Sequence, residues 1–443
     1  MNTNSFDKYI HVVSGQTDLW KAMEHVTSVE SQENPFYVCN VDDIIQKYMT
    51  WNTLMPRVKP HYAIKCNDHP VVLKVIASLG LGFDCATKME IDKVLSIGVD
   101  PSRIIYAHTT KPPSHIQHAA KRKVDLMTFD NELELYKIKE MFPNARLVIR
   151  IRFDAKAAVC LGLKFGCNPY TEAQGLLEIA RNLGLNVVGV SFHVGWACQD
   201  PTAFYGAIKA CRHVFDVAST VGYDFNLLDI GGGYPGDSNS SIEEHAKAIN
   251  SGLDEFFPDQ SIRVISEPGT YFVDSAFSLA CNIHSAKKTI EEDPNTGKPI
   301  TQYLYYVNDG VYGSLSMTIS ANVIKVPKLL KKYPNEKTYP SVIWGPTCDS
   351  TDHLIKDMLL PELKLGDWIV FTDMGAYTLT LVTPFNSFEL PMVYSIISKR
   401  NWLLLHKNLP FVEKDFIIDD ITESTAKSSE KCYKLPESVC VKG

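Results

Sequence analysis

Short apolar runs alternate with longer amphipathic segments from about residue 57 onward. The short runs have the length of buried strands, and the longer ones repeat their apolar residues at helical spacing. The runs predict eight strands: His61–Lys65, Leu81–Cys85, Arg103–His108, Val124–Asp130, Arg146–Arg152, Val187–Val194, Leu227–Gly231 and Arg263–Glu267. The helices predicted between them include Pro70–Leu79, Lys88–Ile97, Asn131–Met141, Glu172–Leu183 and Thr202–Val221.

This alternation of strand and helix indicates the fold class. Strand and helix repeated eight times over roughly 220 residues is typical of a (β/α)8 barrel. We therefore predict an α/β protein in which residues 36–278 form such a barrel. A doubly wound open sheet has the same periodicity and is the alternative.

The helical spacing weakens after about residue 278. Strand-like runs separated by Gly, Pro and Asp turns take its place, and they are Tyr303–Asn308, Ser341–Trp344, Trp368–Phe371 and Met392–Ile397. They predict a β-rich second domain over 279–410, resembling a sandwich or barrel and joined by the N-terminal segment 1–35. Residues 411–443 are polar and rich in Asp, Glu, Ser and Lys, which predicts a flexible tail.

Composition and charge narrow the possible partners. The chain has 443 residues, of which 45% are hydrophobic and 21% charged, as in soluble globular proteins. Its net charge of −7 argues against nucleic acid or an anionic membrane as a partner. We find no long apolar run and no basic-then-apolar leader, so we expect the protein in the cytoplasm. Its 11 cysteines lack CxxC pairs, which favours free thiols over disulfides or a metal site.

Polar residues collect where the predicted strands end. In a (β/α)8 barrel the chemistry lies at the C-terminal ends of the strands. The residues at these ends are Lys65, Asp84, His108, Asp130, Arg150, His193, Asp229 with Gly231–Gly233, and Glu267. Some polar residues at strand ends are expected by chance. A ring that combines a lysine, a histidine, three glycines and a glutamate is expected by chance less often. This edge is therefore the predicted site.

Each member of the ring has an ordinary structural explanation when taken alone. Lys65 can be solvated, Gly231–Gly233 can form a tight turn, His193 can be a core residue, and Glu267 can be a turn carboxylate. Together they match what pyridoxal phosphate requires. A lysine can form a Schiff base with it, glycine N–H groups can hold the phosphate, a histidine ring can stack, and a carboxylate can keep the pyridine nitrogen protonated.

Two segments of the second domain add to this set. Trp344–Asp349 places the thiol of Cys348 beside the carboxylate of Asp349 within a turn. Such a thiol is usually inert, but it can also return a proton to a substrate carbon. The phenol of Tyr377 follows a glycine in Met374–Tyr377, where it can bind phosphate or cap a core.

With these residues assembled, the chain resembles the eukaryotic ornithine decarboxylase family, a group of fold-type III pyridoxal phosphate enzymes. The similarity runs from about residue 35 to about residue 405. Its motifs are long and specific: Tyr62–Asp68, Gly82–Ala86, Ser191–Gly195, Leu228–Gly233, Val307–Gly313, and the segments around Cys348 and Tyr377.

The resemblance implies a role for each motif residue. Lys65 would be the lysine that binds the cofactor covalently, His193 the stacking residue and Glu267 the partner of the pyridine nitrogen. The cofactor site would also include Asp84, Arg150, Gly231, Gly232, Gly233, Thr270 and Tyr377. Cys348 would donate a proton across a head-to-tail homodimer interface. The substrate would meet Asp349, Ser320, Ala321, Tyr312 and Phe385.

Three departures from the family pattern involve four positions. Trp196 replaces a phosphate-binding serine, and Thr270 replaces a phosphate-binding arginine. An arginine–phosphate contact is worth roughly 1.5–3 kcal/mol, so its loss would weaken cofactor binding about ten- to a hundredfold. Ser320 and Ala321 replace a Tyr-Asp pair whose aspartate holds the distal ammonium of ornithine. That change favours a neutral aliphatic substrate such as leucine, as in a leucine-decarboxylating paralogue.

The alternative function is regulatory rather than catalytic. Antizyme inhibitors resemble ornithine decarboxylase, have lost cofactor residues and act by sequestering antizyme. Lys111–Arg146 resembles the antizyme-binding element of the family, and the departures at Trp196 and Thr270 favour this alternative. The retained lysine and its remote proton donor, Lys65 and Cys348, favour an active amino-acid decarboxylase.

Overall fold

The first unit of the protein is a closed barrel of parallel strands. The computed structural model describes residues 9–28, 32–159, 161–292, 297–408 and 410–418. The barrel strands are β3 (Val58–Ala63), β4 (Gly82–Cys85), β5 (Ile104–Tyr106), β6 (Leu126–Phe129), β7 (Arg146–Arg150), β9 (Asn186–Ser191), β11 (Leu227–Asp229) and β12 (Arg263–Ser266). Because β12 pairs with β3, the sheet closes on itself, which excludes the doubly wound alternative. The predicted α/β barrel fold is confirmed.

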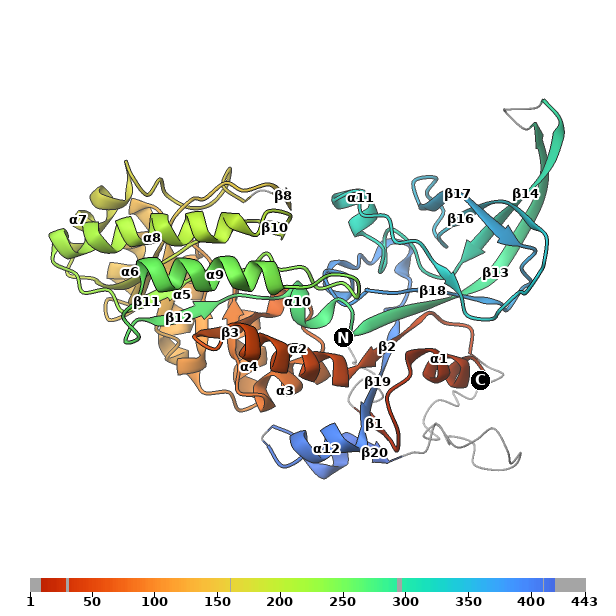
Figure 1. The fold of residues 1–443 in the computed structure, drawn as a ribbon, viewed down its shortest axis with the longest axis horizontal. Coiled ribbons are helices and arrows are strands. Elements are labelled where there is room, and N and C mark those ends of the chain that lie inside the picture. The colour runs from red at the N-terminus through yellow and green to blue at the C-terminus, as the bar shows by residue number, and fades with distance from the viewer. Residues whose placement is uncertain (1–8, 29–31, 160, 293–296, 409, 419–443) are drawn as a thin grey trace.

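Helices surround this barrel on the left of Figure 1. They are α2 (Val41–Leu54), α3 (Pro70–Ser78), α4 (Lys88–Ser96), α5 (Pro113–Arg122), α6 (Glu132–Met141), α7 (Ala173–Asn182), α8 (Thr202–Val221), α9 (Glu243–Phe256) and the short α10 (Thr270–Val273). Their apolar faces follow the helical repeat: α7 buries Ala173, Leu177 and Ala180, which lie one turn apart on one face. Packing against the strands therefore leaves the polar faces outward.

Apolar side chains fill part of the barrel interior. Ile105, Leu126, Val148, Leu227 and Ile265 form one buried cluster contributed by five different strands. Interior layers of this kind make a barrel a packed core rather than a pore. Polar side chains are consequently left to the strand ends, where the loops emerge.

A ten-stranded sheet forms the second unit, on the right of Figure 1. Its path is β17 (His353–Pro361), β16 (Thr338–Trp344), β14 (Pro299–Val307), β13 (Phe277–Glu292), β2 (Phe36–Asn40), β19 (Met392–Ser398), β1 (Ile10–Val13) and β20 (Phe416–Ile418). Off this path, β18 (Trp368–Phe371) pairs with β13, and β15 (Lys328–Leu329) pairs with β18. The N-terminal β1 and β2 both pair with β19. Helices α1 (Leu19–Thr27), α11 (Met317–Ser320) and α12 (Lys399–Leu405) accompany the sheet.

The C-terminal end differs from the sequence prediction. We expected a flexible tail from residue 411, but Phe416–Ile418 pair with β1 as strand β20, and Phe411 and Phe416 are buried. Aromatic burial and a neighbouring edge strand outweigh the polar composition of this segment. The rest of the predicted tail, 419–443, lies outside the described residues.

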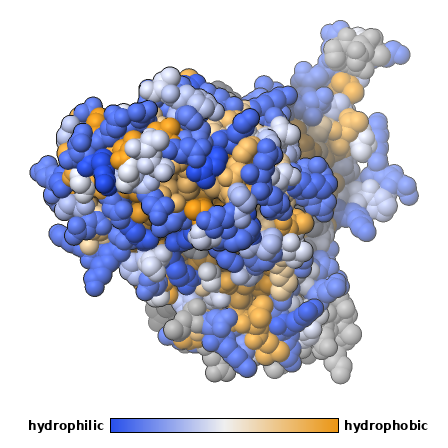
Figure 2. Space-filling model, turned by 60° about the vertical axis from the view of Figure 1, so that its left-hand side comes forward, coloured by the Kyte–Doolittle hydropathy of each residue, from blue (hydrophilic) through white to orange (hydrophobic). Residues whose placement is uncertain are grey.

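The surface of the described residues carries both hydrophilic and apolar side chains (Figure 2). On the face shown in Figure 2, hydrophilic side chains predominate, with smaller apolar areas between them. No helix in the described ranges is both long enough and apolar enough to cross a membrane.

Candidate active site

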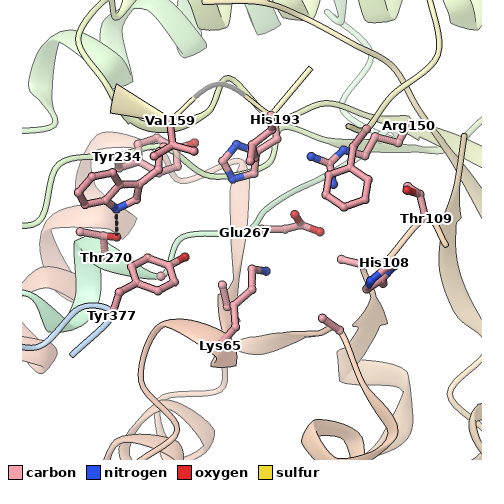
Figure 3. Close-up of a pocket in the computed structure, with 18 of the residues that line it drawn as sticks. Lys65, His108, Thr109, Arg150, Val159, His193, Tyr234, Glu267, Thr270 and Tyr377 are labelled. Carbon is pink, nitrogen blue, oxygen red and sulfur yellow. Dashed lines mark hydrogen bonds between the residues drawn. The ribbon is translucent and has the colours of Figure 1, made fainter. Parts of the chain in front are cut away.

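A cavity of about 340 Å³ lies at the C-terminal ends of the barrel strands. Barrel loops form most of its wall, and residues of the second unit complete it (Figure 3). The lining includes these residues from the predicted site: Lys65, His108, Arg150, His193, Trp196, Gly233, Glu267, Thr270 and Tyr377. The structure therefore brings these predicted residues together around one cavity.

Lys65 is positioned by a turn at the end of β3. The strand ends at Ala63, and residues Ile64–Cys66 form a single 3-10 turn in which Ile64 and Cys66 are buried. Lys65 alone in this turn faces the pocket, and its ammonium contacts the fully buried carboxylate of Asp84. Burial lowers the pKa of Lys65, but the negative charge of Asp84 opposes it, and the net pKa lies above its ordinary value. Lys65 is therefore a cation, and it is paired with Asp84.

Glu267 and Asp229 form a buried acidic pair across from Lys65. Burial, and then the charge of Asp229, raise the pKa of Glu267 well above its ordinary value. Burial raises the pKa of Asp229 to about 6. Glu267 Oε1 has no hydrogen-bond partner among the described residues. A buried carboxyl oxygen without a partner is costly and calls for a polar ligand atom.

His193 presents a neutral ring to the same space. Its Nδ1 accepts a hydrogen bond from the N–H of Gly195 at 3.0 Å, which leaves the proton of the neutral imidazole on Nε2. Burial, followed by the positive charge of Arg150, lowers the pKa of His193 well below its ordinary value. The ring of His193 is thus held uncharged and fixed in orientation, as a stacking residue requires.

The glycine triplet allows three loops to meet. Gly231 and Gly233 have φ of +60° and +116°. A Cβ on Gly231 would lie 2.1 Å from the carbonyl oxygen of Phe192, and one on Gly233 would lie 2.6 Å from that of Gly195. Only glycine fits such an approach. The N–H of Gly233, which lines the pocket, donates to no acceptor among the described residues. The triplet therefore serves both as the tight turn and as a candidate phosphate cradle.

Two of the departures from the family pattern, Trp196 and Thr270, contact each other. The indole Nε1–H of Trp196 donates to Oγ1 of Thr270 at 3.1 Å (Figure 3). Trp196 opens the short strand β10 (Trp196–Cys198), which pairs with β8 (Ala157–Val159). Its ring meets that of Tyr377 edge to face, with centroids 6.4 Å apart. This end of the pocket is therefore walled by an aromatic pair and a hydroxyl.

Tyr377 is tied to the lysine turn. Its N–H donates to the carbonyl oxygen of Cys66 at 3.0 Å, and its φ is +53°. Burial raises the pKa of Tyr377 above its ordinary value, so its phenol stays protonated. A non-glycine residue in this conformation is strained and is usually held for a reason. Here the conformation brings a hydroxyl donor into the pocket (Figure 3).

Several predicted residues lie away from this pocket. Tyr312 donates from its hydroxyl to Asp349 Oδ2 at 2.5 Å, and its ring is 4.6 Å from that of Phe385. Cys348 is exposed beside them, and its N–H donates to Asn386 Oδ1 at 3.2 Å. Neither this surface cluster nor Ser320 and Ala321 at the end of α11 line the cavity of their own chain. One chain therefore does not bring the predicted substrate residues to Lys65.

Asp130 has a structural role in this geometry. Its Oδ2 accepts from the N–H of Gly166 at 2.8 Å and its Oδ1 from the Asn131 side chain at 2.9 Å. It anchors the loop after β7 rather than lining the cavity. Polar strand ends alone do not distinguish such anchors from site residues.

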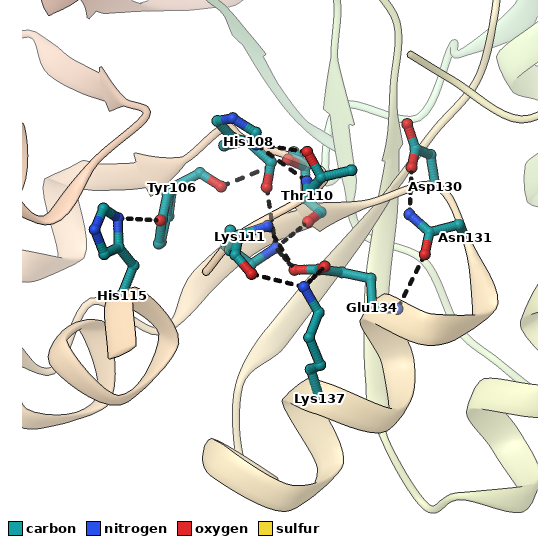
Figure 4. A network of polar contacts seen from close by, with 10 residues as sticks. Tyr106, His108, Thr110, Lys111, His115, Asp130, Asn131, Glu134 and Lys137 are labelled. Carbon is teal, nitrogen blue, oxygen red and sulfur yellow. Dashed lines mark hydrogen bonds and ion pairs between the residues drawn. The ribbon is translucent and has the colours of Figure 1, made fainter. Parts of the chain in front are cut away.

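A buried cation supports the wall that contains His108. The Lys111 ammonium donates to the carbonyl oxygens of His108 at 3.0 Å and Thr128 at 2.6 Å, and it pairs with Glu134 at 2.9 Å (Figure 4). Lys137 pairs with the other Glu134 oxygen at 2.5 Å. Burial lowers the pKa of Lys111 to about 8, even though Glu134 opposes this. This network joins the loop after β5 to strand β6 and helix α6.

Sequence reasoning missed part of the wall. Phe165 lies with its ring 5.1 Å from the Arg150 guanidinium, and Met317 and Leu381 approach from the second unit. Apolar residues in loops carry no periodic signal, so only their position in space identifies them.

Comparison with known proteins agrees with this geometry. A family model described as the pyridoxal binding domain of pyridoxal-dependent decarboxylases matches residues 41–274. Mouse ornithine decarboxylase is 44% identical over 388 residues, covering 85% of this chain and 84% of that protein. The chain belongs to the ornithine decarboxylase family of pyridoxal-dependent decarboxylases. The predicted family, enzyme class and cofactor are thereby confirmed.

Other relatives show how varied the family is. Antizyme inhibitor 2 of Xenopus laevis is 45% identical over 431 residues, covering 96% of this chain and 93% of that protein. Among solved structures, the arginine decarboxylase of Paramecium bursaria Chlorella virus bound to agmatine has a TM-score of 0.80 at 38% identity, covering 85% of this chain and 100% of that one. The same scaffold thus occurs in relatives named as enzymes and in one named as an inhibitor of antizyme.

The residues of the pocket fit pyridoxal phosphate. Lys65 offers an amine that its aldehyde could bind, and the unpartnered oxygen of Glu267 could pair with its ring nitrogen. The backbone at Gly233, which a side chain would fill, is a match for its phosphate. Arg150, the arginine of the described lining, does not lie beside Thr270 (Figure 3), so that end of the pocket would offer a phosphate neutral donors.

Proposed function

We propose that the protein releases the α-carboxylate of a neutral aliphatic L-amino acid, such as leucine, as CO₂ and leaves the corresponding amine. Bound pyridoxal phosphate would draw electrons away from the α-carbon, so that the bond to the carboxylate can break. Lys65 would hold the cofactor, His193 would fix its ring plane, and Glu267 would share a proton with its ring nitrogen. The α-carbon would then receive a proton from the thiol of Cys348.

The observation that carries the substrate proposal is the charge of the pocket. Among the described lining residues Glu267 is the single acid, and we assign it to the cofactor. The rest of the wall contains apolar side chains, including Val159, Leu161, Phe165, Met317 and Leu381. Burying an ammonium without a carboxylate partner is costly. A branched aliphatic side chain incurs no such penalty and gains from burial.

Asp349, the acid among the predicted substrate residues, is already engaged within its own loop. Asp349 accepts from the Tyr312 hydroxyl at 2.5 Å and from the N–H of Thr351 at 2.8 Å. The Tyr312 hydrogen bond, and then that of Thr351, lower the pKa of Asp349 below its ordinary value. Its lone pairs are partly satisfied within its own loop. Asp349 would therefore bind a substrate ammonium more weakly than a free carboxylate would.

The proposal includes a homodimer. Cys348 and Asp349 lie on the surface rather than at the cavity of their own chain, so they can act only on a second copy. Apolar side chains beside them are unusually exposed: Phe385 by 41%, Phe388 by 48% and Leu390 by 58%. Exposed apolar groups that cluster in this way favour a protein interface.

We also place the protein in the cytoplasm. The eight cysteines among the described residues are all free thiols, and seven of them are buried. Such thiols persist in a reducing compartment.

The substrate proposal is tested by CO₂ release from purified protein with added pyridoxal phosphate. Leucine should be decarboxylated faster than ornithine, lysine or arginine at equal concentration. Ala321→Asp should shift the preference toward ornithine, because it returns a carboxylate to the position where the family has one. Ala321→Asn introduces a side chain of the same size as aspartate but without its charge, so it should not shift the preference toward ornithine. Faster release from ornithine by the unmodified protein would refute the substrate proposal.

A second candidate is an antizyme-binding regulator. The 45% identity to an antizyme inhibitor over 96% of the chain favours it. So does the surface of Lys111–Arg146, where α6 exposes Leu133 by 75% and Tyr136 by 46%. Glu134 between them is held inside by Lys111 and Lys137, which fixes the outward face (Figure 4).

Antizyme binding and cofactor binding distinguish the two candidates. A visible cofactor band that is absent from Lys65→Ala, together with CO₂ release, supports the enzyme. Tight antizyme binding that is lost in Leu133→Asp, without a cofactor band, supports the regulator. Met89→Asp, at another exposed apolar position on helix α4, is the matched control for the added surface charge.

A further inference from the structure

Trp196 and Thr270 form a pair that is fixed in orientation. They lie 74 residues apart in the chain, and the indole Nε1–H donates to Thr270 Oγ1 at 3.1 Å. The edge-to-face contact with Tyr377 holds the indole from its other side. Both members of the pair line the cavity. Neither side chain is charged, although the family uses an arginine at the position of Thr270.

The direction of this hydrogen bond determines what Thr270 can do. An indole N–H only donates, so the Thr270 oxygen must accept, and its own hydroxyl hydrogen points elsewhere. The other neighbour of this hydroxyl is the Cys66 thiol, whose pKa is raised to about 12 by burial although the hydrogen bond from Thr270 opposes this. Sulfur is a weak acceptor. The O–H of Thr270 is therefore available to a stronger acceptor in the cavity.

The surroundings supply the rest of an anion site. Gly233 and Tyr234 line the same cavity, and their N–H groups donate to no acceptor among the described residues. The cations of the described lining are Lys65, paired with Asp84, and Arg150, packed with Phe165. Neither lies beside Thr270 in Figure 3.

We propose that Thr270, with Trp196 behind it, is a neutral phosphate-binding relay that replaces the cationic contact of the family. The indole would donate to the hydroxyl, and the hydroxyl would donate to a phosphate oxygen. Chained hydrogen bonds strengthen each other, so the indole increases the donor strength of the hydroxyl. This inference rests on the cofactor site of the proposed function. It adds the two residues that recognise the phosphate and the direction of their coupling.

The relay is tested by titrating the purified protein with pyridoxal phosphate and, separately, with pyridoxal, following the visible absorbance of the lysine adduct. Thr270→Val keeps the shape but removes the hydroxyl, and it should weaken pyridoxal phosphate binding about tenfold. Thr270→Ser, which retains the hydroxyl, should bind nearly as the unmodified protein does. Pyridoxal lacks the phosphate, so its affinity should be the same in all three proteins.

Trp196→Phe tests the coupling. It keeps an aromatic ring but removes the N–H, and it should weaken pyridoxal phosphate binding about threefold with Thr270 present. In a Thr270→Val background it should have no further effect, because the relay is already broken. A double-mutant cycle of these variants measures the coupling directly.

Three outcomes would overturn the relay. They are an unchanged affinity for pyridoxal phosphate in Thr270→Val, an equal loss for both ligands, and fully additive losses from the two positions. Because binding is measured without substrate, failure of decarboxylation leaves this test intact. Conversely, the absence of an adduct with either ligand would overturn the cofactor site and the relay together.

Discussion

Lys111 provides a sharp test of how the barrel supports its pocket. Its side chain is fully buried, with 0% of the surface exposed, yet it carries a cation. The ammonium bonds two backbone carbonyls and pairs with Glu134, which is itself 1% exposed. Lys111→Met keeps the apolar stem of the side chain and removes these contacts.

The cost can be worked out from the contacts. Removing one partner of a buried ion pair costs about 3–5 kcal/mol, because the other charge is left uncompensated. Glu134 keeps Lys137 at 2.5 Å and the backbone N–H of Lys111 at 3.2 Å, so the lower end applies. We therefore expect the free energy of unfolding to fall by about 3 kcal/mol, out of a typical total of about 5–15 kcal/mol.

Urea unfolding followed by circular dichroism measures this loss. Lys121→Met is the matched control, because Lys121 is exposed on α5 and its replacement should change stability by less than about 0.5 kcal/mol. His108 and Thr109 line the cavity, so Lys111→Met should also weaken pyridoxal phosphate binding while the control does not. A loss below about 1 kcal/mol for Lys111→Met would refute the reasoning, because it falls well short of the cost of breaking a buried ion pair.

Three further predictions concern the same framework. Burial lowers the pKa of Lys111 from 10.5 to about 8, so between these pH values the folded protein binds fewer protons than the unfolded chain. The stability advantage of the unmodified protein over Lys111→Met should therefore widen from pH 8 to pH 10 in urea unfolding, and a narrowing gap would contradict this. Gly233→Ala should destabilise the protein by about 1–3 kcal/mol and abolish cofactor binding, whereas Gly175→Ala on α7, with open space around it, should stabilise by about 0.5–1 kcal/mol. The double variant Trp196→Ser, Thr270→Arg restores the family residues and should tighten pyridoxal phosphate binding at least tenfold by absorbance titration, and unchanged affinity would count against the neutral phosphate end.

The barrel was predictable because its signal is local. Apolar runs and helical repeats along residues 57–278 specify strands and helices one at a time, and closure follows once eight pairs alternate. The exact chemistry at a strand end is less local. Lys65 was predicted as the last residue of a strand, but it lies in the 3-10 turn after β3, and this turn directs it into the pocket.

Contacts between distant segments could not be predicted from periodicity. The hydrogen bond between Trp196 and Thr270 joins strand β10 to helix α10, and nothing in either segment indicates the other. The sheet position of Phe416 was missed for the same reason, because pairing with β1 depends on the N-terminal strand. The sequence also could not show that Cys348 lies outside the cavity of its own chain. This position is the physical reason for proposing a dimer, because Cys348 could then reach the cavity of a second copy.

The most direct test is to locate the cofactor chemically. Purified protein is incubated with pyridoxal phosphate, reduced with borohydride and digested, and the modified peptide is identified by mass spectrometry. We predict a single reduced adduct on Lys65, in the peptide that follows β3. The absence of an adduct at Lys65, or labelling spread equally over exposed lysines such as Lys121, would contradict the assignment of this pocket.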